Sequence, residues 1–271
     1  NATLHNFEEI RKKDIRIGDM VEIQRAGDVI PQVLQVIKKS NNRKNIILPP
    51  TQCPVCGSNT FKEVDEAVLR CINTHGCYAQ KISRIIHFIG RKAINIDGFG
   101  EKQVRQFFEL KLINNIYDIF LLKENRSKIE NLEGWGKLSL DNLINSIENA
   151  KTINLDKFIY SLGIRFIGEI NAEILSKEFK TIDNFISSSQ NIEVLSNIDG
   201  LGPKAISSIK KFFSYDKNFK LIKKLSKILN INENKIKNTD NFFNEKNIVF
   251  TGTFNSISRD EAKHIAKEVG A

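Results

Sequence analysis

Hydrophobic and polar residues alternate along the first fifth of the chain, as they do in half-buried β-strands. The alternation covers residues 21–24, resumes over residues 29–30 and 33–37 after a turn at 26–28, and is followed by a short apolar run at 46–48. Such period-two patterns predict strands. A few short strands bury too little apolar surface to fold alone. We therefore expect residues 1–50 to pack on a neighbour or to be the later part of a small barrel.

Between residues 81 and 230 the hydrophobic spacing changes to that of amphipathic helices separated by glycine-containing turns. The apolar positions that follow Gly136 and Gly202 recur three and four residues apart, and they are Leu140, Leu143, Ile144 and Ile147 after the first and Ile206, Ile209, Phe212 and Phe213 after the second. This segment is predicted to be all-helical.

The last part of the chain begins with a polar, Asn-rich stretch at residues 231–246, which predicts a linker. Residues 247–250 are apolar and predict a buried strand, and residues 251–253 predict a turn. Ser258 and Glu261 have the spacing of a capping box at the start of a helix. We expect a further small domain over residues 247–271, and a chain that is cut short at both ends.

Four glycine-containing hairpins repeat within the helical segment. Residues 96–102, 132–137 and 198–204 share the pattern apolar-acid-Gly-apolar-Gly, and residues 164–169 align with them but carry Phe166 at the first glycine position. The first-glycine positions 98, 134, 166 and 200 are 36, 32 and 34 residues apart. A regular period of this size indicates a repeated unit, here a helix-hairpin-helix.

The hairpin glycines suit binding of a phosphate. Glycine adopts a positive φ and has no Cβ to hinder close approach, and the free amides at the start of the following helix favour an anion. Each motif alone is equally consistent with a tight turn between packed helices, and this reading is favoured for the hairpin with Phe166. Residues 81–237 hold 26 basic and 18 acidic residues, +8 of the net charge of +9. Four hairpins in the basic segment favour binding of a nucleic-acid backbone.

All four cysteines fall within 25 positions, in the order Cys53-x2-Cys56-x14-Cys71-x5-Cys77. Two pairs at this spacing predict a structural zinc ion with four sulfur ligands and no open position. A pair of disulfides is the alternative, and it is disfavoured because residues 1–6 lack a signal-peptide core. His75 lies between the last two cysteines and is a less favoured ligand.

Other chemistry is missing from the sequence. It contains neither a P-loop nor a Gly-x-Gly-x-x-Gly motif, and no apolar run is long enough for a membrane span. None of the four histidines pairs with a candidate nucleophile. Asp97 and Asp199 are expected to be hairpin residues, and Trp135 is expected to be an apolar anchor, favoured over a base-stacking wedge.

The order of these parts resembles the C-terminal half of bacterial NAD-dependent DNA ligases. The most specific stretches are residues 2–6, 14–19, 25–31, 53–57 and 70–80, followed by the four hairpins, and residues 248–262 are similar to the opening of a BRCT domain. The resemblance implies a multidomain, mainly α fold with a partial OB-fold β-barrel, a small zinc module, a tandem helix-hairpin-helix domain and a truncated α/β BRCT domain. The implied boundaries are 1–50, 51–80, 81–230, a linker at 231–246, and 247–271.

The resemblance also implies a reaction, in which AMP passes from NAD to a lysine and then to the 5′-phosphate of a nick, and the 3′-hydroxyl displaces AMP with magnesium assisting. That lysine belongs to a Lys-x-Asp-Gly motif. This chain has Asn95 and Asn197 at the lysine position of its two similar stretches. The NAD and Mg²⁺ sites are therefore expected outside it, and its role is expected to be the binding of nicked double-stranded DNA of any sequence.

By the same resemblance, Arg25 is expected to meet DNA near the nick, and the hairpins are expected to hold phosphates across the minor groove. The predicted DNA-binding residues are Arg25, Gly98, Gly100, Lys102, Gly134, Gly136, Lys137, Gly168, Gly200, Gly202 and Lys204. We expect a monomer in the bacterial cytoplasm, associated with the nucleoid. The competing classes are a non-enzymatic repair module and a zinc-stabilised protein-interaction scaffold.

Overall fold

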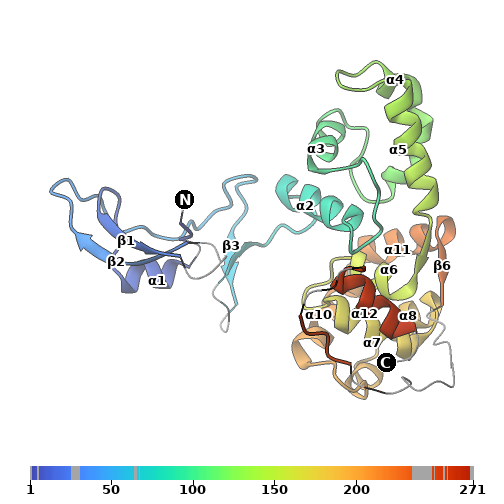
Figure 1. The fold of residues 1–271 in the computed structure, drawn as a ribbon. Helices are drawn as coiled ribbons and strands as arrows, with labels where there is room; N and C mark the ends of the chain where they lie inside the picture. Colours follow the sequence, from blue (N-terminus) through green and yellow to red (C-terminus); the bar gives the residue numbers. More distant parts are fainter. Residues whose placement is uncertain are drawn as a thin grey trace. The chain divides into compact units, whose positions relative to one another are not determined.

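The chain forms two units in the computed structural model, Asn1–Ser83 and Arg84–Ala271, with helix α2 (Tyr78–Ile89) running across their boundary (Figure 1). The structure describes residues 2–4, 6–25, 31–63, 66, 68–233, 246, 248–252, 254 and 256–268. The predicted turn at 26–28 and the strand residues 29–30 lie outside the described residues. Within them, no helix combines the length and apolar composition needed to cross a bilayer.

The first unit contains an antiparallel pair of strands, β1 (Met20–Gln24) and β2 (Gln32–Lys38), whose register shifts twice. Both strands were predicted from their alternation. A short helix, α1 (Phe7–Lys12), packs beside them and was missed. Its Asn6 N-cap accepts a hydrogen bond from the backbone N–H of Glu8 at 3.0 Å.

The predicted strand at residues 46–48 is wrong, because this segment has no regular structure. Ile47 is partly buried against the small core of Ile10, Ile15 and Val33, so one side chain of the apolar run does meet the core. Its neighbours Ile46 and Leu48 are exposed. The two prolines that follow lack backbone N–H groups, so they add no donors for strand pairing.

An ion-pair network links the segment before β1 to the segment after β2. The Arg43 guanidinium donates to Asp19 through Nε and to Asp14 through Nη1, at 2.9 and 2.8 Å, and the Asp19 side chain is fully covered from solvent. Asp19 also accepts from the backbone N–H groups of Arg16 and Ser40. The hydrogen bond from Arg43 lowers the pKa of Asp14 to about 2 and lowers that of Asp19 as well.

The second unit is mainly helical, as predicted. Its helices after α2 and through residue 228 are α3 (Glu101–Glu109), the 3-10 helix η1 (Asp118–Asn125), α4 (Arg126–Glu130), α5 (Lys137–Asn149), α6 (Leu155–Ser161), α7 (Glu169–Phe179), α8 (Ile182–Ser188), α9 (Ile192–Ser196), α10 (Pro203–Ser214) and α11 (Asp216–Ile228). The predicted apolar face of α5 is buried in full. On α10, Ile209 and Phe213 are buried together with Ala205, whereas Ile206 and Phe212 are only half-buried.

Two short strands interrupt the predicted all-helical pattern. β5 (Thr152–Asn154) pairs in parallel with β6 (Asn230–Asn232). The predicted linker boundary is therefore corrected, because residues 231 and 232 belong to this sheet. Pairing between segments so far apart in sequence depends on the tertiary fold and leaves no local pattern.

At the end of the chain, Ser258 and Glu261 form the predicted capping box. The backbone N–H of Ser258 donates to Glu261 Oε2 at 2.7 Å, and that of Glu261 donates to Ser258 Oγ at 3.2 Å. Helix α12 (Arg259–Glu268) follows. The predicted buried strand is wrong for residues 248–250, which are in none of the three sheets, and Val249 is 83% exposed. Residue 247 lies outside the described residues.

Candidate nucleic-acid interface and metal centre

All four predicted hairpins have the same backbone geometry. The first-glycine position has a left-handed conformation in each, with φ of 76° at Gly98, 81° at Gly134, 62° at Phe166 and 81° at Gly200. The next residue closes the turn by donating its N–H to the carbonyl three residues earlier, at 3.3, 3.0, 3.0 and 3.2 Å in chain order. The alignment of the motifs, including the one without its first glycine, is therefore confirmed.

Phe166 keeps the hairpin conformation although a left-handed backbone is costly for a residue with a Cβ. Asn171 donates from Nδ2 to the Phe166 carbonyl at 2.7 Å, and the Arg165 guanidinium lies 4.6 Å from the centre of the Phe166 ring. These contacts hold the third hairpin in the geometry that glycine gives to the others.

The second glycine of each hairpin is the N-cap of the following helix. Gly100, Gly136, Gly168 and Gly202 are all extended and precede α3, α5, α7 and α10. A Cβ at the last three would meet nothing within 4 Å, and one at Gly100 would meet only the end of the Gln103 side chain at 3.3 Å. Internal packing therefore does not require glycine here. The missing side chains leave the backbone open to a partner.

The amides differ between hairpins in a way that the sequence analysis missed. The N–H of Gly100 donates to Gln103 Oε1 at 3.2 Å, and that of Gly136 donates to Ser139 Oγ at 2.9 Å. Both acceptors are three residues after the glycine, the capping-box spacing. In α3 and α5 the first amides of the helix itself still lack intrahelical partners. In α10 the first residue, Pro203, has no N–H, and the N–H of Ala205 donates to the Gly202 carbonyl at 3.0 Å, which leaves the N–H groups of Gly202 and Lys204.

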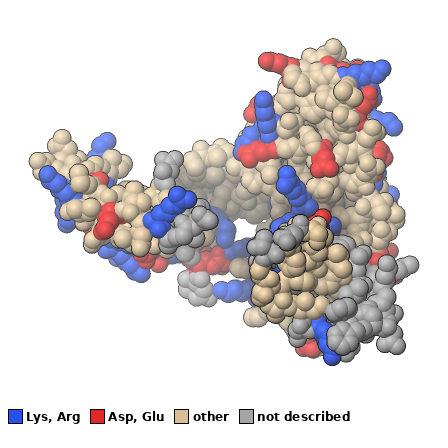
Figure 2. Space-filling model, in the orientation of Figure 1, with Lys and Arg blue, Asp and Glu red and all other residues tan. Residues whose placement is uncertain are grey.

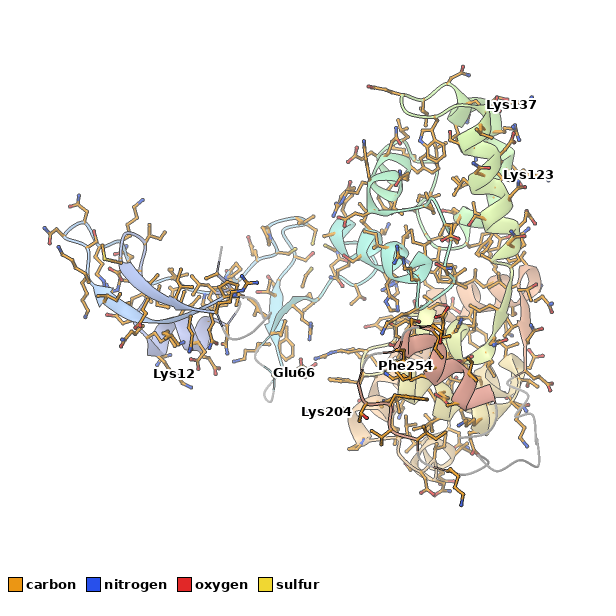
Figure 3. All side chains as sticks on the ribbon, viewed as in Figure 1. Lys12, Glu66, Lys123, Lys137, Lys204 and Phe254 are labelled. Atoms are coloured by element: carbon orange, nitrogen blue, oxygen red, sulfur yellow. The ribbon has the colours of Figure 1, made fainter. Side chains whose placement is uncertain are left out.

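The three predicted hairpin lysines, Lys102, Lys137 and Lys204, are exposed, and none forms an ion pair with the described residues. Figure 3 places Lys137 and Lys204 at opposite ends of the second unit. By contrast, the acidic residues that begin α3 and α7 are each paired, Glu101 with Arg105 at 2.6 Å and Glu169 with Lys92 at 2.7 Å. This pairing reduces their repulsion of an anion.

The first and second hairpins face each other across a groove of about 400 Å³, whose lining includes Gly98, Lys102, Gln103, Gly134, Trp135 and Ser139. Trp135 is held in place there. The centre of its ring lies 5.0 Å from the centre of the Phe107 ring, and its Nε1 donates to Gln106 Oε1 at 3.0 Å. The predicted role of Trp135 as an anchor is confirmed.

Basic side chains are spread over the face seen in Figure 2, with acidic ones between them. The described residues on that face form no continuous basic patch, so an interface made by them would depend on discrete contacts. Arg25, the remaining predicted DNA contact, is exposed directly after β1 in the first unit.

The four cysteines come together in the first unit around the antiparallel hairpin of β3 (Thr60–Lys62) and β4 (Leu69–Cys71). Cys53 and Cys56 precede β3, Cys71 ends β4 and Cys77 follows it. Their sulfur atoms all lie within 4.8 Å of one another, and His75 is not part of the group. Tetrahedral zinc with bonds of about 2.3 Å needs sulfurs about 3.8 Å apart, and Cys56 Sγ lies 3.5 Å from Cys71 Sγ. The cluster fits structural Zn²⁺, and all four thiols are free of disulfides.

Backbone turns position these thiols. Gly57, with φ of 70°, donates to the Cys53 carbonyl at 2.9 Å, which closes the first knuckle. Hydrogen bonds from the Ser58 side chain and backbone lower the pKa of the Cys56 thiol to about 6, and burial raises that of Cys71 to about 11. Because zinc binds thiolates, it would displace the protons that remain.

Two family models match the first unit. The NAD-dependent DNA ligase OB-fold domain matches residues 1–45, and the NAD-dependent DNA ligase C4 zinc finger domain matches residues 52–79. Residues 1–45 and 52–79 thus match two domains that are described from NAD-dependent DNA ligases. A helix-hairpin-helix motif matches residues 157–222, which include the third and fourth hairpins.

The curated relatives that match the chain are named DNA ligases. The chain is 48% identical over 278 residues to the DNA ligase of Pelagibacter ubique (strain HTCC1062) and 43% identical over 283 residues to that of Rickettsia bellii (strain RML369-C). It is 42% identical to the DNA ligase of Rickettsia prowazekii (strain Madrid E). These alignments cover 99 to 100% of the chain, which spans 41% of the length of each relative.

Proposed function

We propose that this chain is the DNA-binding part of an NAD-dependent DNA ligase that seals nicks in duplex DNA during replication and repair. Its own residues hold the duplex by the backbone. Because the chain contains no Lys-x-Asp-Gly motif, the NAD and Mg²⁺ sites and the adenylated lysine belong to another part of such a ligase.

The observation that carries this proposal is the repetition of one hairpin geometry four times, each time with an N-cap glycine. The side-chain position of that glycine is empty in three hairpins and meets only the end of the Gln103 side chain in the first. Helix N-termini with uncovered amides bind phosphate oxygens. Phosphates are the same for every sequence, so such contacts position a duplex without reading its bases. The lysines beside three hairpins, Lys102, Lys137 and Lys204, add charge where the phosphates would lie.

The first unit contributes in two ways. Arg25 at the end of β1 supports a DNA contact near the nick, on the strand surface that OB-folds use for nucleic acid. Zinc held by Cys53, Cys56, Cys71 and Cys77 would stabilise the segment that contains these cysteines. A site closed by four sulfurs has no position for water or substrate, so its role is structural.

The finer parts of the proposal follow the family resemblance. We infer an OB-fold over residues 1–50, a zinc module over 51–80, a hairpin domain over 81–230 and the start of a BRCT domain over 247–271. The protein would act as a monomer on nicked duplex in the bacterial cytoplasm, in association with the nucleoid.

The decisive experiment measures binding of the chain to a nicked duplex by fluorescence anisotropy over a series of KCl concentrations. The expected result is an affinity that falls steeply with salt, with a slope of about −0.9 per phosphate contact, and that is equal for duplexes of different sequence. A flat salt dependence, or a strong preference for one sequence, would refute the proposal and favour a protein-interaction scaffold.

A second experiment separates a ligase from a non-enzymatic repair module. Gly136→Ala and Gly202→Ala are introduced together into the full-length protein that contains this chain. The variant should still form the ligase–AMP adduct with NAD, because the hairpins take no part in that step, but it should seal nicks much more slowly. A full-length wild-type protein that forms no adduct would exclude the ligase assignment.

A further inference from the structure

The second residue of the helix after each hairpin differs in kind between hairpins. The first and fourth hairpins carry Lys102 and Lys204 at this position, whereas the second and third carry Leu138 and Ile170. All four lie two residues after the N-cap glycine, and the hairpins share one backbone geometry. These side chains therefore occupy the same place relative to the hairpin amides.

Leu138 and Ile170 are unusually exposed. Their exposed fractions are 75% and 76%, the highest of any large apolar side chain among described residues 84–233, where the next is Leu110 at 49%. Single exposed leucines or isoleucines are common on protein surfaces. Here the two most exposed ones coincide with one repeated position, which in the other hairpins holds a cation.

We propose that Leu138 and Ile170 pack against the deoxyribose faces next to the phosphates that their hairpins bind, while Lys102 and Lys204 contact phosphates directly. The proposal deepens the proposed function and rests on it. Each backbone phosphate is flanked by two sugars, whose C–H groups are the apolar surface nearest to it. A side chain two residues beyond the N-cap is close enough to a phosphate on the helix amides to cover such a sugar.

This division of roles explains why the middle hairpins lack a lysine at the second helical position, although the second hairpin has Lys137 one residue earlier. An apolar side chain gains free energy only when a partner covers it, and a sugar face is a suitable partner that every nucleotide provides. The contact adds affinity without adding ionic contacts, and it reads no base. Binding would then combine an ionic part, from Lys102, Lys137 and Lys204, with an apolar part, from Leu138 and Ile170.

The test compares two double variants of the chain in the salt titration with nicked duplex. Leu138→Ala with Ile170→Ala should weaken binding about 25-fold, about fivefold for each side chain, at every salt concentration. The slope of log affinity against log salt should stay at the wild-type value. Lys102→Ala with Lys204→Ala should instead reduce the slope by about 1.8, about 0.9 for each lost phosphate contact.

Leu110→Ala is the matched control, since Leu110 is also exposed but lies at the opposite end of α3 from Lys102. It should bind as the wild type does. This inference would be overturned if the Leu138/Ile170 double variant bound with wild-type affinity, or if its salt slope fell as in the lysine variant. Either outcome would leave the proposed function intact. A wild-type chain that fails to bind nicked duplex at any salt concentration would overturn both.

Discussion

Two glycines of the fourth hairpin allow DNA contact to be separated from folding. Gly200 has φ of 81°, and a Cβ added there would lie 3.1 Å from Ile174 Cδ1. Gly202 has φ of −71° and ψ of 160°, and a Cβ there would meet nothing within 4 Å. This conformation is also the one favoured before a proline, such as Pro203. We therefore expect Gly200→Ala to impair folding and Gly202→Ala to impair DNA binding alone.

The magnitudes follow from these geometries. A left-handed alanine costs about 1–2 kcal/mol, which for a domain of this size lowers the melting temperature of Gly200→Ala by about 2–8 °C. At Gly202 the small loss of folding stability from replacing an N-cap glycine with alanine is offset by the reduced entropy of the unfolded chain. The melting temperature should therefore change by less than about 2 °C. A methyl group that displaces one phosphate from the helix amides removes about 1.5–3 kcal/mol of binding free energy. This loss weakens the affinity about ten- to hundredfold.

The assay combines thermal unfolding by circular dichroism with anisotropy of a labelled nicked duplex at fixed KCl. Gly202→Ala should melt as the wild type does and bind at least tenfold more weakly. Gly202→Ala with both wild-type stability and wild-type affinity would refute phosphate binding by this hairpin. A large loss of stability in the same variant would show instead that the glycine serves internal packing.

Two further predictions concern the first unit, and one concerns the second. Because Arg43 lowers the pKa of Asp14 from 3.8 to about 2, this pair contributes stability above pH 4 and loses it as the pH falls toward 2; Arg43→Met should flatten the acid dependence of urea unfolding in this range, and an unchanged profile would contradict the network. Cys77→Ser removes a buried sulfur of the cluster and should reduce zinc measured by atomic absorption well below one ion per chain, whereas stoichiometric zinc would count against the four-sulfur site. Trp135→Phe keeps an aromatic ring beside Phe107 but removes the indole N–H that donates to Gln106, and should lower the free energy of unfolding in urea by about 1 kcal/mol; a loss of about 3 kcal/mol would mean that the smaller phenyl ring no longer packs in the place of the indole.

Local rules predicted the hairpins well because each hairpin is a local structure. The spacing of Gly98, Gly134 and Gly200 predicted both the left-handed turns and the helices that follow them. The same spacing placed Phe166 in the series, although a propensity argument alone would have removed it. What the sequence did not indicate is how Asn171 supports that residue, since an asparagine at this position has several possible partners.

Apart from helix α1, whose Asn6 N-cap is a local signal, the wrong or missing predictions concern interactions between distant segments. The pairing of β5 with β6 and the Arg43 contacts to Asp14 and Asp19 join residues that only the tertiary fold brings together. Residues 248–250 were expected to be buried because they are apolar. Hydrophobicity gives a preference for burial but does not supply a partner, and among the described residues none pairs with this segment.

The hairpins also come in pairs, and this affects how weak contacts combine. Six residues after the second glycine of the first hairpin, Gln106 contacts the second hairpin through the Trp135 ring nitrogen and the Glu133 carbonyl. At the equivalent position after the third hairpin, Ile174 lies against Gly200 of the fourth. Each helix thus holds the next hairpin in place before any ligand arrives. When one hairpin of a pair has bound a phosphate, the other is already positioned and loses little further entropy on binding. Individual contacts of modest strength can then combine to give high affinity for a duplex, and none of them depends on the base sequence.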